Sequence, residues 1–313
     1  MPREPEPSLP AQLFLRSALR AGQRLTPRPL LSHRPLSLTF SPTPGTVHLS
    51  LGRTTIHVRI SSTVTVPFPD RKFDGIFTIS TELSPLASPA FEVGRQNDAE
   101  TLLSRLLEKT IRRSGALDTE SLCIVAGQKV FAVRADVHVL DFDGGLVDAA
   151  CAAVVAGLLH YRRPEVEVRG EEVRVFDPRE REPVKLSLNH VPFCVSFSFF
   201  RNVGEEVVGK GGSGYAGDGE EVVLVDADLG EEMVRDAELV VGMNRFGEVV
   251  QLAKYGGYPI DPVAVVKCTG IALEKVKWLH GVVMEKLEED EKKRNVDGLM
   301  AELRADNERN IPG

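Results

Sequence analysis

Two carboxylates six positions apart, Asp226 and Glu232, are the first residues of this chain whose types and spacing could support chemistry. They lie in the segment LVDADLGEEMVRD, where a predicted strand ends in a loop. Two carboxylates held together can bind a metal ion or act as a general acid and a general base. The alternative interpretation is a solvated acidic loop, and the spacing alone favours that alternative.

A glycine turn that opens a predicted helix is the second candidate. Gly144-Gly145 precedes an alanine-rich segment, and such a turn at a helix N-terminus is a common place to hold phosphate. Leu146 and Val147 come next, and neither side chain can donate a hydrogen bond. Asp148 adds a negative charge that we expect to interact with the helix dipole and to repel an anion. The segment therefore has the backbone of a phosphate site without its side chains.

A glycine-rich loop, GKGGSG at 209–214, contains the spacing of a dinucleotide-binding fingerprint. That fingerprint needs a strand before it and a helix directly after it. Here an acidic segment and then a predicted strand follow, so we interpret the loop as a flexible insertion. A nucleotide-binding enzyme that uses this loop is the alternative.

Three basic residues recur on one face of the helix predicted over Asn97–Ser114. Arg105, Lys109 and Arg112 stand at i, i+4 and i+7, which places them on the same side of an α-helix. Asn97 is the expected cap and Gly115 the expected end. The predicted buried face comprises Ala99, Leu102, Leu103, Leu106 and Ile111.

Composition limits the classes of protein that need be considered. The 313 residues are 42% hydrophobic, which is enough for one large or two modest domains. A net charge of −7 argues against a general nucleic-acid binder and leaves room only for a local basic patch. The four cysteines form no C-x-x-C pair, so we expect buried thiols in a reducing compartment, with no bound metal and no cofactor. No secretory signal and no apolar run of membrane length are visible.

The elements around these candidates predict a mixed α/β (α+β) protein built in blocks. Alternating strand patterns follow a proline-rich connector, and a long helix comes near the C-terminus. We expect an N-terminal helical arm over 1–24 and a first half over 25–164. A second half over 165–258 includes the glycine-rich insertion 203–221, and a C-terminal helix with a charged tail occupies 259–313.

Four segments in this order resemble the RNase PH superfamily, and more closely the ring subunits of the eukaryotic RNA exosome. They are SPAFEVGRQNDAE, LDTESLCIVAGQKVFAVRADVHVL, DFDGGLVDAACAAVVAGLLHYRRP and LSLNHVPFCVSFSFF. The resemblance covers roughly residues 14–287 and implies an RNase PH-like fold, of the ribosomal protein S5 domain 2-like type. That fold has two related sheet-and-helix halves plus a long C-terminal helix, and six such subunits form a ring around an RNA channel.

The resemblance also implies what each candidate residue is. Active relatives hold phosphate with a Ser- or Thr-Arg pair directly after the glycine turn, where this chain has Leu146 and Val147. Lys109 stands at a second phosphate-binding position, and Asp226 and Glu232 stand at an Asp pair as degenerate remnants. The resemblance therefore implies no catalytic residue and no enzymatic activity. An active phosphorolytic 3′-5′ exoribonuclease is the alternative.

A further departure from the family lies in the connector. The segment RLTPRPL replaces the usual R-x-D-G-R with Thr26-Pro27 at its centre, which puts the contacts made there in doubt.

The implied function is a structural and RNA-guiding subunit that supports 3′-5′ RNA degradation and rRNA processing. Arg105, Lys109 and Arg112 would contact RNA phosphates in the channel, a solvated charged face being the alternative. The implied partners are RNA, other ring subunits, chiefly ribosomal RNA-processing protein 41, and the cap subunits, but no membrane. The implied locations are the nucleus, the nucleolus and the cytoplasm. We also expect the strand ending in Phe199-Phe200, with the segment FDGIFTIS, to supply apolar residues to an interface.

Overall fold

The computed structural model describes residues 7–92, 97–169, 172–177, 180–201 and 221–294. The predicted insertion 203–221 therefore lies outside the described residues except for Glu221, and the charged tail from 295 onward lies outside them too. Among the described helices, none is long and apolar enough to cross a membrane.

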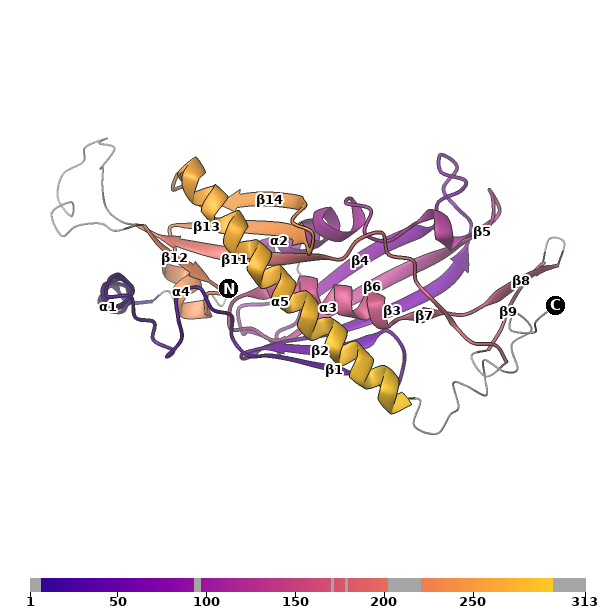
Figure 1. The fold of residues 1–313 in the computed structure, drawn as a ribbon, viewed down its shortest axis with the longest axis horizontal. Coiled ribbons are helices and arrows are strands. Elements are labelled where there is room, and N and C mark those ends of the chain that lie inside the picture. The colour runs from indigo at the N-terminus through magenta and orange to yellow at the C-terminus, as the bar shows by residue number, and fades with distance from the viewer. Residues whose placement is uncertain (1–6, 93–96, 170–171, 178–179, 202–220, 295–313) are drawn as a thin grey trace.

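A six-stranded sheet forms the first half of the protein (Figure 1). Its order is β1-β2-β3-β6-β4, with β5 added on β6, and only the β4–β6 pair is parallel. Its strands alternate between apolar and polar residues, so one face is buried and the other meets water. The strands are β1 (Leu36–Phe40), β2 (Thr46–Leu51), β3 (Thr54–Thr65), β4 (Ile76–Leu83), β5 (Cys123–Val125) and β6 (Lys129–Asp141).

A four-stranded antiparallel sheet of order β12-β11-β13-β14 forms the second half. Two short ribbons, β7 with β10 and β8 with β9, lie between the halves in the sequence. The strands are β7 (Arg162–Arg163), β8 (Val166–Arg169), β9 (Glu172–Val175), β10 (Val184–Lys185), β11 (Pro192–Phe200), β12 (Val222–Val225), β13 (Ala237–Asn244) and β14 (Val249–Tyr255).

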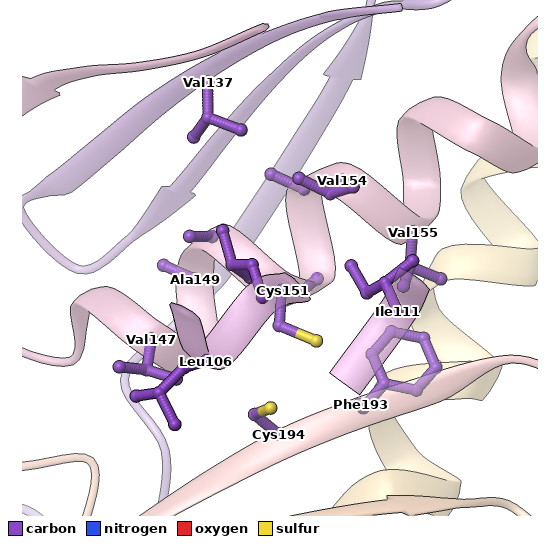
Figure 2. Close-up of a cluster of buried hydrophobic side chains, with 14 of the residues drawn as sticks. Leu106, Ile111, Val137, Val147, Ala149, Cys151, Val154, Val155, Phe193 and Cys194 are labelled. Carbon is purple, nitrogen blue, oxygen red and sulfur yellow. The ribbon is translucent and has the colours of Figure 1, made fainter. Parts of the chain in front are cut away.

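Two helices join these sheets into one body. Helix α3 (Leu146–His160) packs on β2 and β3 of the first sheet and on β11 of the second, which explains why its alanines are all buried. Figure 2 shows side chains of α3 between those of β6 and β11. Helix α5 (Pro262–Arg294) runs across both halves, in contact with β11, β13 and β1 (Figure 1). Its buried residues recur at helical spacing: Cys268, Ala272, Val276, Leu279, Val283 and Leu287.

The helix predicted over Asn97–Ser114 is two elements. Helix α2 (Asp98–Leu107) continues into a π-helix (Glu108–Arg112), in which the amide of Arg113 donates to the carbonyl of Glu108, five residues back, at 2.9 Å. The buried stripe also differs by about one residue from the prediction. Leu103, Leu106, Leu107 and Ile111 are buried, whereas Ala99 and Leu102 are exposed, which corrects the predicted face.

The expectation that the aromatic strand supplies an interface is wrong for β11. All nine of its residues are buried, including Phe199 and Phe200. Helices α3 and α5 contact this strand, and Phe200 packs with Leu15 and Leu19 of the N-terminal helix α1 (Leu9–Arg20). Because the chain covers both faces of β11 itself, the apolar run needs no partner.

Candidate functional site at the junction of the two halves

At the glycine turn before α3, the backbone lies very close to the loop that follows β12. Gly144 and Gly145 both have left-handed backbone angles, with φ of +78° and +64°. A Cβ atom on Gly144 would lie 2.6 Å from the carbonyl oxygen of Ala227, and one on Gly145 would lie 2.6 Å from Oδ1 of Asp226. The turn therefore presses against the loop that follows β12, and only glycine fits at either position.

Asp226 lies at the centre of this junction, and both oxygens of its carboxylate accept hydrogen bonds. The residue is buried and has a φ of +52°, in a region where non-glycine residues are uncommon. Nη2 of Arg34 donates to Oδ1 at 2.7 Å, the Arg34 amide donates to Oδ2 at 2.7 Å, and Nη1 of Arg28 donates to Oδ2 at 3.1 Å. Burial favours the neutral acid, but the hydrogen bonds and charge of Arg34 outweigh it and hold the pKa below its usual range.

The connector between α1 and β1, residues 21–35, carries both Arg28 and Arg34 and supplies a second buried ion pair. Arg24 donates from Nε to Oε1 of Glu231 at 2.9 Å, and its Nη2 contacts the other carboxylate oxygen. Glu231 belongs to the first turn of α4 (Leu229–Val234), where it forms a capping box with Asp228. Arg24 and Arg28, which flank Thr26-Pro27, both bind buried carboxylates of the second half, so the departure at these two positions does not prevent ion pairs here.

Sequence reasoning missed the arginines of the connector as site residues. Each finds its partner about 200 residues further along the chain, so no local pattern pairs it with a carboxylate. The available signal was composition: Arg24, Arg28 and Arg34 concentrate positive charge in a short proline-rich segment of an acidic protein.

Glu232, the second predicted carboxylate, lies on the other side of the glycine turn. Its Oε1 accepts a 2.8 Å hydrogen bond from the amide of Gly145 and lies 3.6 Å from Nη1 of Arg235. Its side chain is 18% exposed, and burial raises its pKa to about 7. The structure therefore brings both predicted carboxylates to Gly145, one ionised within an arginine cluster and one able to hold a proton near neutral pH.

Leu146 and Val147, which follow the turn, are core residues. They are 9% and 8% exposed, and both belong to the main hydrophobic cluster. Figure 2 shows Val147 beside Leu106 of α2. Two apolar side chains thus occupy the first turn of α3 at the point where the carboxylates, the glycine turn and the arginines meet.

Asp148 does not face the helix N-terminus as expected. It is 3% exposed, and its Oδ2 accepts hydrogen bonds from the amide and the hydroxyl of Ser196 on β11, at 2.9 and 2.8 Å. Burial raises its pKa well above the usual range despite these bonds. The expectation that Asp148 repels an anion from the turn is therefore corrected: its carboxyl group joins α3 to the second sheet.

The predicted basic stripe is at the surface. Arg105, Lys109 and Arg112 are all exposed, and the π-helix begins between the first two of them. Nη1 of Arg112 donates to Oε1 of Glu108 at 3.0 Å, while no carboxylate of the described residues pairs with Arg105 or Lys109. The cations available to an anionic ligand are therefore chiefly those of Arg105 and Lys109.

The junction is not arranged as a metal centre. In the described ranges, no three His, Cys, Asp or Glu side chains converge as ligands. Asp226 is instead neutralised by guanidinium groups, which take the place that a cation would need. What the arrangement can do is lock the connector, the glycine turn and the β12–α4 loop together through buried charges.

Two family models match the chain. Residues 32–164 match domain 1 of the 3′ exoribonuclease family, and residues 190–275 match domain 2. Their boundary falls between α3 and β11, where the structure passes from the first sheet to the second.

Curated relatives resemble the chain over nearly its whole length. Exosome complex component RRP45 of Saccharomyces cerevisiae is 43% identical over 99% of this chain and 100% of the relative. The Schizosaccharomyces pombe component of the same name is 44% identical with the same coverage. The human component is 38% identical over 91% of this chain and 61% of its own length.

Solved structures share the fold. A chain of the Archaeoglobus fulgidus exosome with RNA bound to the active site aligns with a TM-score of 0.70 at 26% identity, over 87% of this chain and 96% of its own. A chain of an archaeal exosome core aligns with a TM-score of 0.68 at 23% identity, over 88% and 96% respectively.

Proposed function

The chain belongs to the 3′ exoribonuclease family, and we propose that within it the chain serves as a non-catalytic, RNA-guiding subunit of the RNA exosome ring. Family membership confirms the resemblance and the RNase PH-like fold predicted from the sequence. The assembly follows from relatives that carry the name of one exosome component, RRP45, over nearly the full length of this chain.

The proposed absence of catalysis is carried by one observation, the apolar pair Leu146 and Val147 directly after the glycine turn. Phosphorolysis needs a bound phosphate as nucleophile, and a phosphate needs hydrogen-bond donors or cations at its oxygens. Two buried aliphatic side chains provide neither. Without the nucleophile, a carboxylate nearby has no reaction to assist.

The state of Asp226 supports the same proposal. Each oxygen of its carboxylate accepts hydrogen bonds from arginines of the connector, and the residue is fully buried. A carboxylate used in this way has no free lone pairs for a metal ion or a substrate. The side chain of Glu232 is partly exposed, but its Oε1 accepts a hydrogen bond from the amide of Gly145.

An assay of the purified chain with RNA, inorganic phosphate and Mg²⁺ tests the proposal. We expect no release of nucleoside diphosphate above that of a buffer control. Phosphate-dependent release that disappears in Glu232→Gln would contradict the proposal and support the active phosphorolytic enzyme. Glu232→Gln is preferred to Asp226→Ala here because the latter leaves buried arginines without a partner.

The glycine-rich loop at 209–214, the basis of the nucleotide-binding alternative, lies outside the described residues. Its deletion should leave RNA guiding intact.

We propose that the partners are RNA, the other RNase PH-like ring subunits, chiefly ribosomal RNA-processing protein 41, and the cap subunits. The apolar residues available for such contacts are not those of β11. They include Val66, Phe68 and Phe73 between β3 and β4, which are 67%, 57% and 66% exposed. Co-expression with ribosomal RNA-processing protein 41 should yield a stable complex, and a soluble monomer that fails to bind that subunit would contradict this proposal.

We propose that the protein occurs in the nucleus, the nucleolus and the cytoplasm. Microscopy of fluorescent fusions would test these locations.

A further inference from the structure

Three imidazoles stand in a row on the polar face of the first sheet. His48 on β2 is directly opposite His57 on β3, and His57 is directly opposite His138 on β6. Buried aliphatic residues alternate with them along each strand, so all three histidines lie on the face away from the core. Three of the seven histidines of the chain are thus neighbours, although they are far apart in the sequence.

The spacing of the rings suits a shared ligand. The centroids of His48 and His57 are 4.4 Å apart, and those of His57 and His138 are 6.2 Å apart. Two imidazoles bound to one tetrahedral ion at about 2.1 Å have ring centres roughly 5 Å apart. The two observed distances lie on either side of that value, so small side-chain rotations would bring either pair to the distance for coordination.

The outer histidine of the row is oriented by a carboxylate. Nδ1 of His138 lies 3.1 Å from Oε2 of Glu82, its neighbour on the parallel strand β4. A carboxylate on one ring nitrogen fixes the tautomer and leaves the other nitrogen as a lone-pair donor, which is the usual support of a metal-binding histidine. For His48 and His57, no ring nitrogen has a protein hydrogen-bond partner within the described residues.

From this geometry we propose that the row binds one divalent ion of the zinc, nickel or copper class, with His57 as the central ligand and His48 as the second. An all-imidazole donor set suits these metals and not Mg²⁺ or Ca²⁺. This site is separate from the junction of the two halves and does not depend on the proposed RNA-guiding function.

The three histidines lie side by side across the strands, and this arrangement limits how many of them can bind one ion at once. As arranged, no three candidate ligands in the described part of the chain meet at one point, so the ion has two imidazoles and completes its shell with water. His138 becomes a third ligand only if its ring turns toward His57.

Titration of the full-length chain with Zn²⁺ by isothermal calorimetry tests the site. We expect one ion per chain, an affinity at least about tenfold weaker in His57→Asn and His48→Asn, and a smaller loss in His138→Asn. His280→Asn, on α5 and outside the row, is the matched control and should bind like the wild type. All four positions are partly or fully exposed, so melting curves should show that each variant is folded.

Co²⁺ absorption separates this site from binding at cysteine. Coordination by imidazole and water gives a visible spectrum without the thiolate charge-transfer band, and that spectrum should disappear in His57→Asn. Zn²⁺ binding that is unchanged in His57→Asn, a thiolate band, or no binding by the wild-type chain would each overturn the proposal. If the chain is studied in an assembled ring, the same variants are compared within the same assembly, so that sites on other subunits cancel.

Discussion

Arg34 and Asp226 form a two-point contact across the junction of the halves: side chain and backbone of Arg34 each donate to the Asp226 carboxylate, at 2.7 Å. The same guanidinium donates to the carbonyl oxygens of Asp143 and Gly144, at 2.5 and 2.9 Å. One residue of the N-terminal connector therefore holds the glycine turn of the first half and the loop of the second half at once.

Arg34→Ala should destabilise the protein by about 3 to 5 kcal/mol, because it leaves the buried Asp226 carboxylate without its main partner. Equilibrium unfolding in urea measures the change. Arg53→Ala removes an exposed arginine of the β2–β3 turn and should change the free energy of unfolding by less than about 0.5 kcal/mol. Equal effects of the two substitutions would show that the junction does not depend on this ion pair.

Gly145→Ala should be more destabilising than an equivalent substitution at Gly115. Both glycines have positive φ, +64° and +70°, so alanine costs backbone strain of about 1 kcal/mol or more at either position. Only at Gly145 does the new Cβ collide, at 2.5 Å from Nη2 of Arg34, whereas the Gly115 site is open. The difference between the losses in free energy of unfolding caused by Gly145→Ala and Gly115→Ala measures the cost of the collision. Equal losses would mean that Arg34 and its neighbours move aside at little cost.

Glu232 should make stability depend on pH near neutrality. Burial raises its pKa to about 7 in the folded chain, so the folded state binds the proton more tightly than the unfolded state. Its stabilising contribution is complete below about pH 4.5 and is lost as the pH rises through about 7. That loss is on the order of 3 kcal/mol.

Glu232→Gln keeps an oxygen for the amide of Gly145 and removes the titration. The variant should therefore gain stability relative to the wild type as the pH rises from about 5 to about 8, measured by urea unfolding at each pH. The exposed Glu120→Gln is the control for a general loss of negative charge. A constant difference between Glu232→Gln and the wild type across this range would contradict the assignment.

The basic stripe should contribute to RNA binding through phosphate contacts. Changing Arg105, Lys109 and Arg112 to Glu should weaken RNA binding by the assembled ring without preventing assembly, and should reduce the slope of log affinity against log salt by about 2. Arg112 should contribute least of the three, because it pairs with Glu108.

A charge-matched variant of the stripe keeps the overall change in net charge equal. It replaces Arg53, Arg59 and Arg134, which are exposed on the first sheet or its turns, with Glu. The prediction holds only if RNA protection falls in the stripe variant and stays near the wild-type level in this second one. Equal losses would assign the effect to net charge alone.

The sequence alone determined the elements and the family of this protein. Alternation of apolar and polar residues predicted the strands, and the alanine-rich run after the glycine turn predicted a helix, which is α3. Ordered motifs predicted the RNase PH-like fold. These features depend on residues close together in the chain, where backbone geometry and burial leave a periodic pattern.

Only the tertiary structure decided what the site residues contact. The partners of Asp226 come from the connector nearly 200 positions earlier, and Asp148 turned out to bind Ser196 instead of facing the helix end. Likewise, the aromatic run of β11 was expected to need a partner, but two layers of the same chain cover it. The sequence pattern around a charged residue or an apolar run does not indicate which residue it will contact. Those contacts depend on how distant segments pack together and on the high free-energy cost of leaving a buried polar group unpaired.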